Sequence, residues 1–267
     1  MITLDNLRAG LALGEFFLEY LPTVSLPDGR CIGAEVLARW RRAGGVVMPD
    51  DFIPLAENTP LSGLITYWMI DTVAAEMSDW LRANPEAHLS INVPPEILGR
   101  GGMEYAANKS GLIEFASQFI LEITERGLPD LIGVEAINQL GRMGVRVALD
   151  DVTLTGGANL AILARCNLHT VKLDKSLVAQ ISPQCPAPDW LVGIKAMLGS
   201  SQMEVIAEGV ETAQQFDTLR TANIQAAQGF YFSRPIPAAE FIAYYDEARA
   251  SFGEDQSAPS AILDWPN

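Results

Sequence analysis

The sequence predicts an α/β fold of the TIM-like (β/α)8 barrel type. Six short apolar segments after residue 87 alternate with helix-sized segments, which is the pattern of βα units and a parallel sheet. Two earlier strand-like segments bring the number to eight, and 267 residues is an ordinary length for such a barrel. No GxGxxG or Walker-type loop follows any of these strands, which disfavours an open nucleotide-binding sheet.

The predicted elements follow one another in a simple order. A short helix over 5–13 precedes a strand pair, FFLEYLPTVSL and CIGAEVLARW, which is joined by the turn Pro27-Asp28-Gly29. Residues 41–60 form a loop with a short helical piece, and a helix over 61–82 ends before Asn84-Pro85. The later strands are HLSINV, FILEITE, VRVALDD, TVKLDKS, EVIAEGVE and AAQGFYF. Helices are expected between them over 129–143, 189–198 and 212–221.

The chain is expected to form one barrel domain over residues 1–252. Residues 253–267 make a polar, Pro-containing C-terminal tail, which we interpret as a frayed end rather than a docking peptide. Because 49% of the residues are hydrophobic, the domain has enough apolar side chains for a sizeable core.

The charge balance excludes several classes of partner. With 33 acidic and 18 basic residues the net charge is −15, which argues against binding a nucleic acid polymer or an anionic membrane surface. The N-terminus lacks the pattern of a signal peptide, and no apolar run reaches the roughly 18 residues of a membrane span. The three cysteines form no CxxC pair, so neither a disulfide framework nor a zinc site is indicated. These features predict a cytoplasmic location.

A polar residue interrupts the apolar run near the carboxyl end of seven strands. For any single strand, a surface position would explain this. In a parallel barrel the carboxyl ends converge on one face, where a ring of carboxylates would repel itself unless cations lay within it. The ligands would be oxygen atoms, and both histidines lie near strand beginnings, so Mg²⁺ or Mn²⁺ suits this face better than zinc. The residues are Glu35, Asn92, Glu122, Asp150, Asp151, Lys172, Glu208 and Gln228.

This set of side chains suits the hydrolysis of a phosphodiester. Two divalent cations about 3.5–4 Å apart can bind a phosphodiester oxygen and lower the pKa of a bridging water. Lys172 is the one cation of the set. We expect it to orient the water or offset charge on the phosphoryl oxygens, with a simple salt bridge to an aspartate as the alternative.

The motifs that carry these residues resemble those of the EAL-domain family. Glu35-Val36-Leu37 is followed by Arg39, and the similarity extends in the family's order over about residues 7–245. The resemblance implies a bacterial, metal-dependent phosphodiesterase that uses two divalent cations to open cyclic di-GMP to linear pGpG. It also implies a modified barrel in which one strand runs antiparallel to the others. The further motifs are LEITE at 121–125, DD at 150–151, VKLDKS at 171–176, EGVET at 208–212 and QGFYFSRPIP at 228–237.

The resemblance also implies roles for single residues. Lys172 and Gln228 would assist the water and the metal ligands, and with Glu35 and Glu208 they make up the catalytic set. The metal ligands would be Glu35, Asn92, Glu122, Asp150, Asp151 and Glu208.

A second group of residues would bind the substrate or support the loops that border the site. Arg39 matches the arginine that contacts a substrate phosphate, and Leu37 and Gln228 complete the substrate-binding set. Glu125 matches the glutamate that steadies the loop after the paired aspartates, and Asp174 supports the same wall.

The chain departs from the family pattern mainly in that loop. The family sequence DDFGTGYSSL becomes DDVTLTGGANL, one residue longer, with Val152 for the aromatic residue and Thr153 for the glycine. In the family this loop organises the second metal site and couples it to a dimer interface. Elsewhere, Leu21 replaces the glutamine of Tyr-Gln-Pro, and Pro94 replaces a serine beside Asn92.

Two functions from different classes stay open on the sequence alone. An active phosphodiesterase is favoured because every metal ligand of the family is present. The alternative is a module that binds cyclic di-GMP or a protein partner without useful turnover. A homodimer through an apolar helix face and residues 152–160 is also open, and ordinary barrel packing is the alternative for that face.

Overall fold

The structure is a computed structural model that describes residues 2–124, 130–153, 166–200 and 203–250. Its centre is a sheet of nine strands in the order β1-β9-β8-β7-β6-β5-β4-β2-β3, and an additional β1–β2 pairing closes eight of them into a barrel. The strands are β1 (Phe16–Ser25), β2 (Cys31–Arg42), β3 (Gly45–Val47), β4 (His88–Asn92), β5 (Phe119–Thr124), β6 (Arg146–Val152), β7 (Thr170–Leu173), β8 (Glu204–Ala207) and β9 (Ala226–Ala227).

Strand β1 runs against the rest of the barrel. It pairs antiparallel with both of its neighbours, β2 and β9, whereas the pairs from β2–β4 round to β8–β9 are parallel. The short β3 pairs antiparallel with the end of β2 and lies outside the closed ring. The predicted modified barrel with one antiparallel strand is therefore confirmed.

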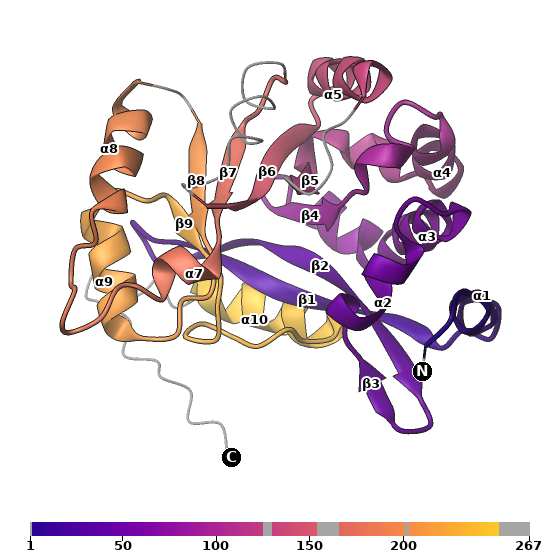
Figure 1. The fold of residues 1–267 in the computed structure, drawn as a ribbon, viewed down its shortest axis with the longest axis horizontal. Coiled ribbons are helices and arrows are strands. Elements are labelled where there is room, and N and C mark those ends of the chain that lie inside the picture. The colour runs from indigo at the N-terminus through magenta and orange to yellow at the C-terminus, as the bar shows by residue number, and fades with distance from the viewer. Residues whose placement is uncertain (1, 125–129, 154–165, 201–202, 251–267) are drawn as a thin grey trace.

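Helices surround these strands (Figure 1). The last helix packs on β1 and β2, and so covers the outside of the antiparallel pair. The α-helices are α1 (Leu4–Ala12), α2 (Pro49–Ala56), α3 (Pro60–Ala83), α4 (Gly102–Ser110), α5 (Leu131–Arg142), α7 (Lys175–Val178), α8 (Trp190–Ser200), α9 (Ala213–Thr221) and α10 (Ala238–Ala250). Two 3₁₀ helices, η1 (Pro95–Ile97) and η2 (Leu112–Gln118), lie between β4 and β5.

Side-chain caps fix where several helices begin. The Thr59 hydroxyl accepts a hydrogen bond from Leu61 N, and Pro60 occupies the first helical position of α3, where its missing N–H costs nothing. At α9, Thr212 and Gln215 form a capping box. The helices expected over 5–13, 61–82, 129–143, 189–198 and 212–221 agree closely with α1, α3, α5, α8 and α9.

Alternation along β1 separates the core from the barrel interior. Tyr20 faces outward, where its ring stacks on Phe241 of α10 at a centroid distance of 5.8 Å. Phe16 also faces outward and stacks on Trp40 of β2 at 5.3 Å. Because neighbouring strand residues point to opposite faces, the intervening residues of β1 turn toward the interior of the barrel.

Gly33 allows β2 and β4 to approach closely. A Cβ atom added at Gly33 would lie 2.1 Å from the backbone oxygen of His88, which is its partner on β4. Gly33 also lies two residues before Glu35 on the same face of β2, so the spacing of these two strands sets the position of that carboxylate.

We therefore expect Gly33→Ala to lower the free energy of unfolding, by about 1–3 kcal/mol as is usual for overpacking of a tight interior. Urea unfolding monitored by tryptophan fluorescence measures this loss. Gly44→Ala is the matched control, because a Cβ atom at Gly44 meets nothing within 4 Å. Equal unfolding midpoints for the two variants would contradict the close approach.

Candidate active site

Lys172 lies at the centre of a buried acidic cluster at the carboxyl ends of the barrel strands. Only 1% of its side chain is exposed, and its Nζ lies 3.1 Å from Glu35 Oε2 and 2.8 Å from Glu122 Oε1. Asp150 Oδ1 and Glu208 Oε1 lie 3.3 Å and 2.6 Å from the same nitrogen. An ammonium group has three N–H donors, so it cannot hydrogen-bond all four carboxylates at once.

The two predicted amides lie at the edges of this cluster. Asn92 is the strand partner of Glu122, and its Nδ2 donates a hydrogen bond of 2.9 Å to Glu35 Oε1. Gln228 follows β9, and its Nε2 donates a hydrogen bond of 2.8 Å to the hydroxyl of Thr23 on β1. In both residues the amide nitrogen is held by the protein, which leaves the amide oxygen as the group for a ligand.

A bulge in β6 brings the paired aspartates to one side. Successive strand residues normally point to opposite faces, which would separate Asp150 from Asp151. The pairing of β6 with β7 is irregular between Leu149 and Val152, and Asp151 adopts a positive φ of 56°. Carboxylate oxygens of Asp150, Asp151 and Glu208 consequently lie within 4.8 Å of one another, a spacing that could hold a metal ion.

Several buried oxygens of the cluster have no hydrogen-bond donor among the residues that the structure describes. These are both carboxylate oxygens of Glu122, Oδ1 of Asp150 and Oε1 of Gln228. Two of them, Glu122 Oε1 and Asp150 Oδ1, are within ion-pair distance of Lys172 without the geometry of a hydrogen bond. Buried acceptors normally have partners, so this donor set fits hard cations that bind oxygen.

The close packing of buried carboxylates also shifts their pKa values. Burial raises the pKa of Asp150 to about 6 and that of Glu208 to about 8. Burial and the neighbouring Glu35 carboxylate raise the pKa of Glu122 well above its ordinary range. Burial also opposes the charge on Lys172, but the surrounding carboxylates outweigh it and raise the pKa of Lys172. The ammonium therefore stays charged while protons compete for the carboxylates.

Arg39 lies further along β2 from the cluster and is paired. Its Nε donates a hydrogen bond of 2.7 Å to Glu19 of β1, and its Nη1 donates to the Ala38 carbonyl oxygen at 3.0 Å. Leu37 lies between Glu35 and Arg39 on the same face of β2 and is half-buried, and Leu21 faces Glu35 across the β1–β2 pair.

The remaining predicted residues border the site or lie beyond the described structure. Asp174 caps α7 by accepting a hydrogen bond of 2.9 Å from Ser176 N. Val152 is buried in β6. Glu125 and residues 154–160 of the loop lie outside the described residues.

Two contributing residues were not identified from the sequence. Glu19 and Thr23 lie on β1, where they contact Arg39 and Gln228. A signal was available, because both share the alternation of Leu21, two residues away on either side.

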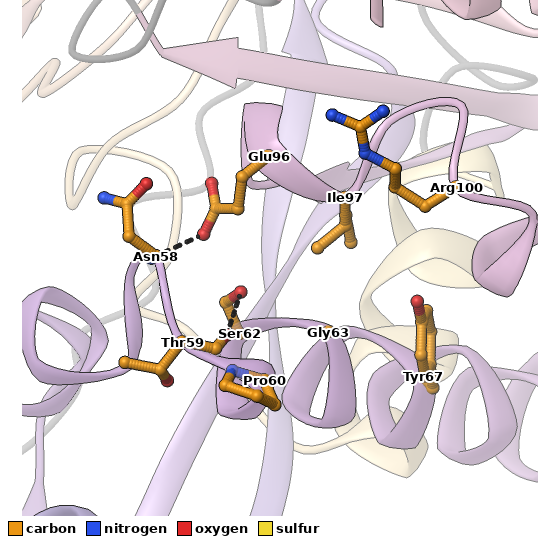
Figure 2. A pocket seen from close by; sticks show the side chains of 9 residues that line it. All are labelled: Asn58, Thr59, Pro60, Ser62, Gly63, Tyr67, Glu96, Ile97 and Arg100. Carbon is orange, nitrogen blue, oxygen red and sulfur yellow. Dashed lines mark hydrogen bonds between the residues drawn. The ribbon is translucent and has the colours of Figure 1, made fainter. Parts of the chain in front are cut away.

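A surface hollow lies outside the acidic cluster. Figure 2 shows the side chains of Glu96 and Arg100 around this hollow, which also borders the start of α3. The Asn58 backbone N–H donates a hydrogen bond of 2.8 Å to Glu96 Oε1. Because Glu96 belongs to η1, just after Asn92, this bond fixes the turn that follows β4. None of the predicted metal ligands lines the hollow.

Known proteins resemble this chain in both sequence and structure. It is 32% identical over 241 residues to the probable cyclic di-GMP phosphodiesterase PdeB of Escherichia coli (strain K12), covering 86% of this chain and 44% of the relative. It is also 32% identical over 253 residues to the cyclic di-GMP phosphodiesterase NbdA of Pseudomonas aeruginosa, covering 90% of this chain and 32% of NbdA. The solved PaMucR phosphodiesterase in complex with c-di-GMP matches with a TM-score of 0.79 and 29% identity, covering 89% of this chain and 98% of that one.

These matches cover most of this chain but only part of each curated relative. The chain spans less than half the length of the first curated relatives that it matches. Within the described residues, no helix has both the length and the apolar character needed to cross a membrane. The model of the EAL domain family matches residues 4–235, and the chain belongs to that family.

Proposed function

We propose that this chain is a metal-dependent phosphodiesterase that hydrolyses cyclic di-GMP to linear pGpG. The observation that carries the proposal is the buried cluster in which four carboxylates surround the ammonium of Lys172, with Asp151 beside two of them and the Asn92 amide on a third. The names of PdeB and NbdA support the activity, and the c-di-GMP complex of PaMucR supports the ligand. The unpaired cysteines are consistent with the proposed bacterial cytoplasm.

The charge of the cluster supports two divalent cations. Five ionised carboxylates against the single ammonium would leave four negative charges, which two Mg²⁺ or Mn²⁺ ions would balance. When bound, such ions supply Lewis acidity toward a phosphodiester oxygen and lower the pKa of water. We propose as their ligands Glu35, Asn92, Glu122, Asp150, Asp151 and Glu208.

The chain's own residues would position the substrate and stabilise developing charge. Lys172 presents a buried ammonium to oxygens of the reacting phosphate, where a low dielectric strengthens its effect. The Gln228 amide oxygen, oriented through the bond from its Nε2 to Thr23, can accept a hydrogen bond from the attacking water. Glu19 orients the Arg39 guanidinium, and Nη2 remains to bind a phosphate oxygen.

Removing one predicted ligand tests the site. We expect Glu35→Gln to lower kcat by roughly a hundredfold or more, because misplacing reacting groups by about 1 Å has an effect of this size. Formation of pGpG from cyclic di-GMP, with Mg²⁺ or Mn²⁺, is measured by chromatography. Glu114→Gln, at an exposed position in η2, is the control and should retain the parent rate. An unimpaired Glu35→Gln variant would refute the metal-site assignment.

The same assay separates the enzyme from the alternative of a binding module. Equilibrium binding of cyclic di-GMP is measured in parallel by calorimetry. Binding without pGpG formation in either ion would identify a module without useful turnover and would refute the proposed activity.

The raised pKa of Glu208 links stability to pH. A carboxyl with a higher pKa in the folded state binds more protons when folded, so folding is favoured at low pH. This stabilisation is complete below the ordinary value of 4.5 and is lost as the pH rises to about 8. Asp150 acts in the same direction at lower pH, between 3.8 and about 6. Divalent cations must displace these protons, so their binding strengthens as the pH rises.

We therefore expect EDTA-treated protein to melt at a lower temperature at pH 8.5 than at pH 7. In this interval His88 and His169 stay neutral in the folded protein, because burial lowers both of their pKa values. Adding Mg²⁺ should raise the melting temperature more at pH 8.5 than at pH 7. Glu208→Gln should weaken the pH dependence, and an unchanged dependence in that variant would contradict the role of Glu208. Melting is followed by circular dichroism.

A further inference from the structure

An exposed aromatic residue and a cation form a pair close to the acidic cluster. Phe230 lies two residues after Gln228, and 51% of its surface is exposed. The Cζ atom of Arg234 lies over its ring, 4.5 Å from the centroid. Because Phe230 is half-exposed and lies two residues from a proposed site residue, its ring is a candidate for ligand contact.

The backbone that carries Phe230 is fixed to the turn that carries Glu208. Val210 N donates a hydrogen bond of 3.0 Å to the Gln228 carbonyl oxygen, and Tyr231 N donates one of 2.9 Å to the Val210 carbonyl oxygen. Between these two bonds, Gly229 lies against the Val210 backbone, where a Cβ atom would be 2.2 Å from the oxygen. Phe230 is thus held two residues after Gln228 and against the segment that follows Glu208.

Its aromatic neighbours have a structural role that Phe230 does not share. Phe216, Tyr231 and Phe232 pack against one another with centroid distances of 5.3–6.0 Å. Within the described structure Phe230 takes part in none of these ring contacts, and its contact with Arg234 is its only cation–π pair. Arg234 covers one face of the ring, so a ligand that stacks on that face would displace the guanidinium toward the ligand's own edge.

The charge near this pair also favours an anionic nucleotide. Arg234 is exposed, and no carboxylate among the described residues forms an ion pair with it. Lys175, at the start of α7, lies against Gly209 and likewise has no described carboxylate partner. Arg39 and Lys172, in contrast, are already balanced by carboxylates. Two cations without an ion pair to any described carboxylate thus lie on the segments that follow Lys172 and Gln228, in a chain of net charge −15.

We propose that Phe230 and Arg234 recognise a guanine base of the cyclic dinucleotide, the ring by stacking and the guanidinium by donating hydrogen bonds to O6 and N7. This inference rests on the proposed function. A ribose separates each base from its phosphate, so a base needs a surface beside the metal site rather than within it. Stacking on an aromatic ring is open to any base, whereas the paired O6 and N7 acceptors distinguish guanine from adenine. The two side chains would thus divide affinity and specificity between them.

The test compares substrates that do and do not carry a base. The parent, Phe230→Ala and Arg234→Gln are assayed with cyclic di-GMP, cyclic di-AMP and bis(p-nitrophenyl) phosphate, which is a phosphodiester without a nucleobase. For Phe230→Ala, we expect kcat/KM for cyclic di-GMP relative to the base-free substrate to fall about tenfold, mainly through KM. For Arg234→Gln, the preference for cyclic di-GMP over cyclic di-AMP should fall about tenfold.

Controls separate this inference from misfolding and from the proposed function. Tyr105→Ala removes an aromatic residue that is 70% exposed on α4 and should keep the parent ratios. Phe230→Trp should preserve stacking, and Phe230→Leu gives a second truncation if the alanine variant does not fold. Parent ratios in the Phe230 and Arg234 variants would overturn the inference. If the parent does not hydrolyse cyclic di-GMP, the proposed function fails, and binding affinities of the parent and variants measured with Mg²⁺ present test the base contact on their own.

Discussion

The contact between Lys172 and its four carboxylates is the interaction on which the rest of the site depends. Burying ionised carboxylates is costly unless they are paired, and Lys172 is the cation that the protein places among them. Oxygens of Glu122 and Asp150 nevertheless have no hydrogen-bond donor among the described residues, although both carboxylates lie within ion-pair distance of the ammonium. The single ammonium of Lys172 thus holds the carboxylates together but does not neutralise all of their negative charge. The remaining negative charge is what makes the site suitable for divalent cations.

The reversed direction of β1 explains how the cluster is completed. A barrel needs a strand between β9 and β2, and β1 fills this place while antiparallel to both. β1 therefore starts at the end of the barrel where the other strands finish, and runs from there into the interior. Its inward-facing side chains line the site along this path. Glu19 pairs with Arg39 near the mouth, and Thr23 supports Gln228. In this way β1 positions side chains of both its neighbours without supplying a proposed metal ligand itself.

The sequence predicted those site residues that can be recognised from the pattern of a single strand. Each interrupted apolar run indicates its own residue, and strand ends of a barrel converge, so the sequence alone predicts that Glu122 and Lys172 lie together. The β6 bulge could not be predicted, because adjacent aspartates show no sign of the positive φ at Asp151 that turns both to one side. Glu35 also differs from expectation, since it lies in the middle of a twelve-residue strand rather than at its end. Partners such as Glu19 depend on the register between two strands, which a single sequence specifies weakly.

The electrostatics of the site imply an order of binding under the proposed function. An anionic dinucleotide that approaches the carboxylates of Glu35, Glu122 and Glu208 is repelled unless cations have neutralised them first. Arg39 cannot offset this repulsion alone, because Glu19 already balances its charge. Substrate and metal affinities are therefore coupled. The coupling is reciprocal, so cyclic di-GMP increases the affinity for the cations by the same factor by which the cations increase the affinity for cyclic di-GMP. Contacts at Phe230 and Arg234 lie outside the carboxylate cluster, so they add affinity for the base that depends less on the cations.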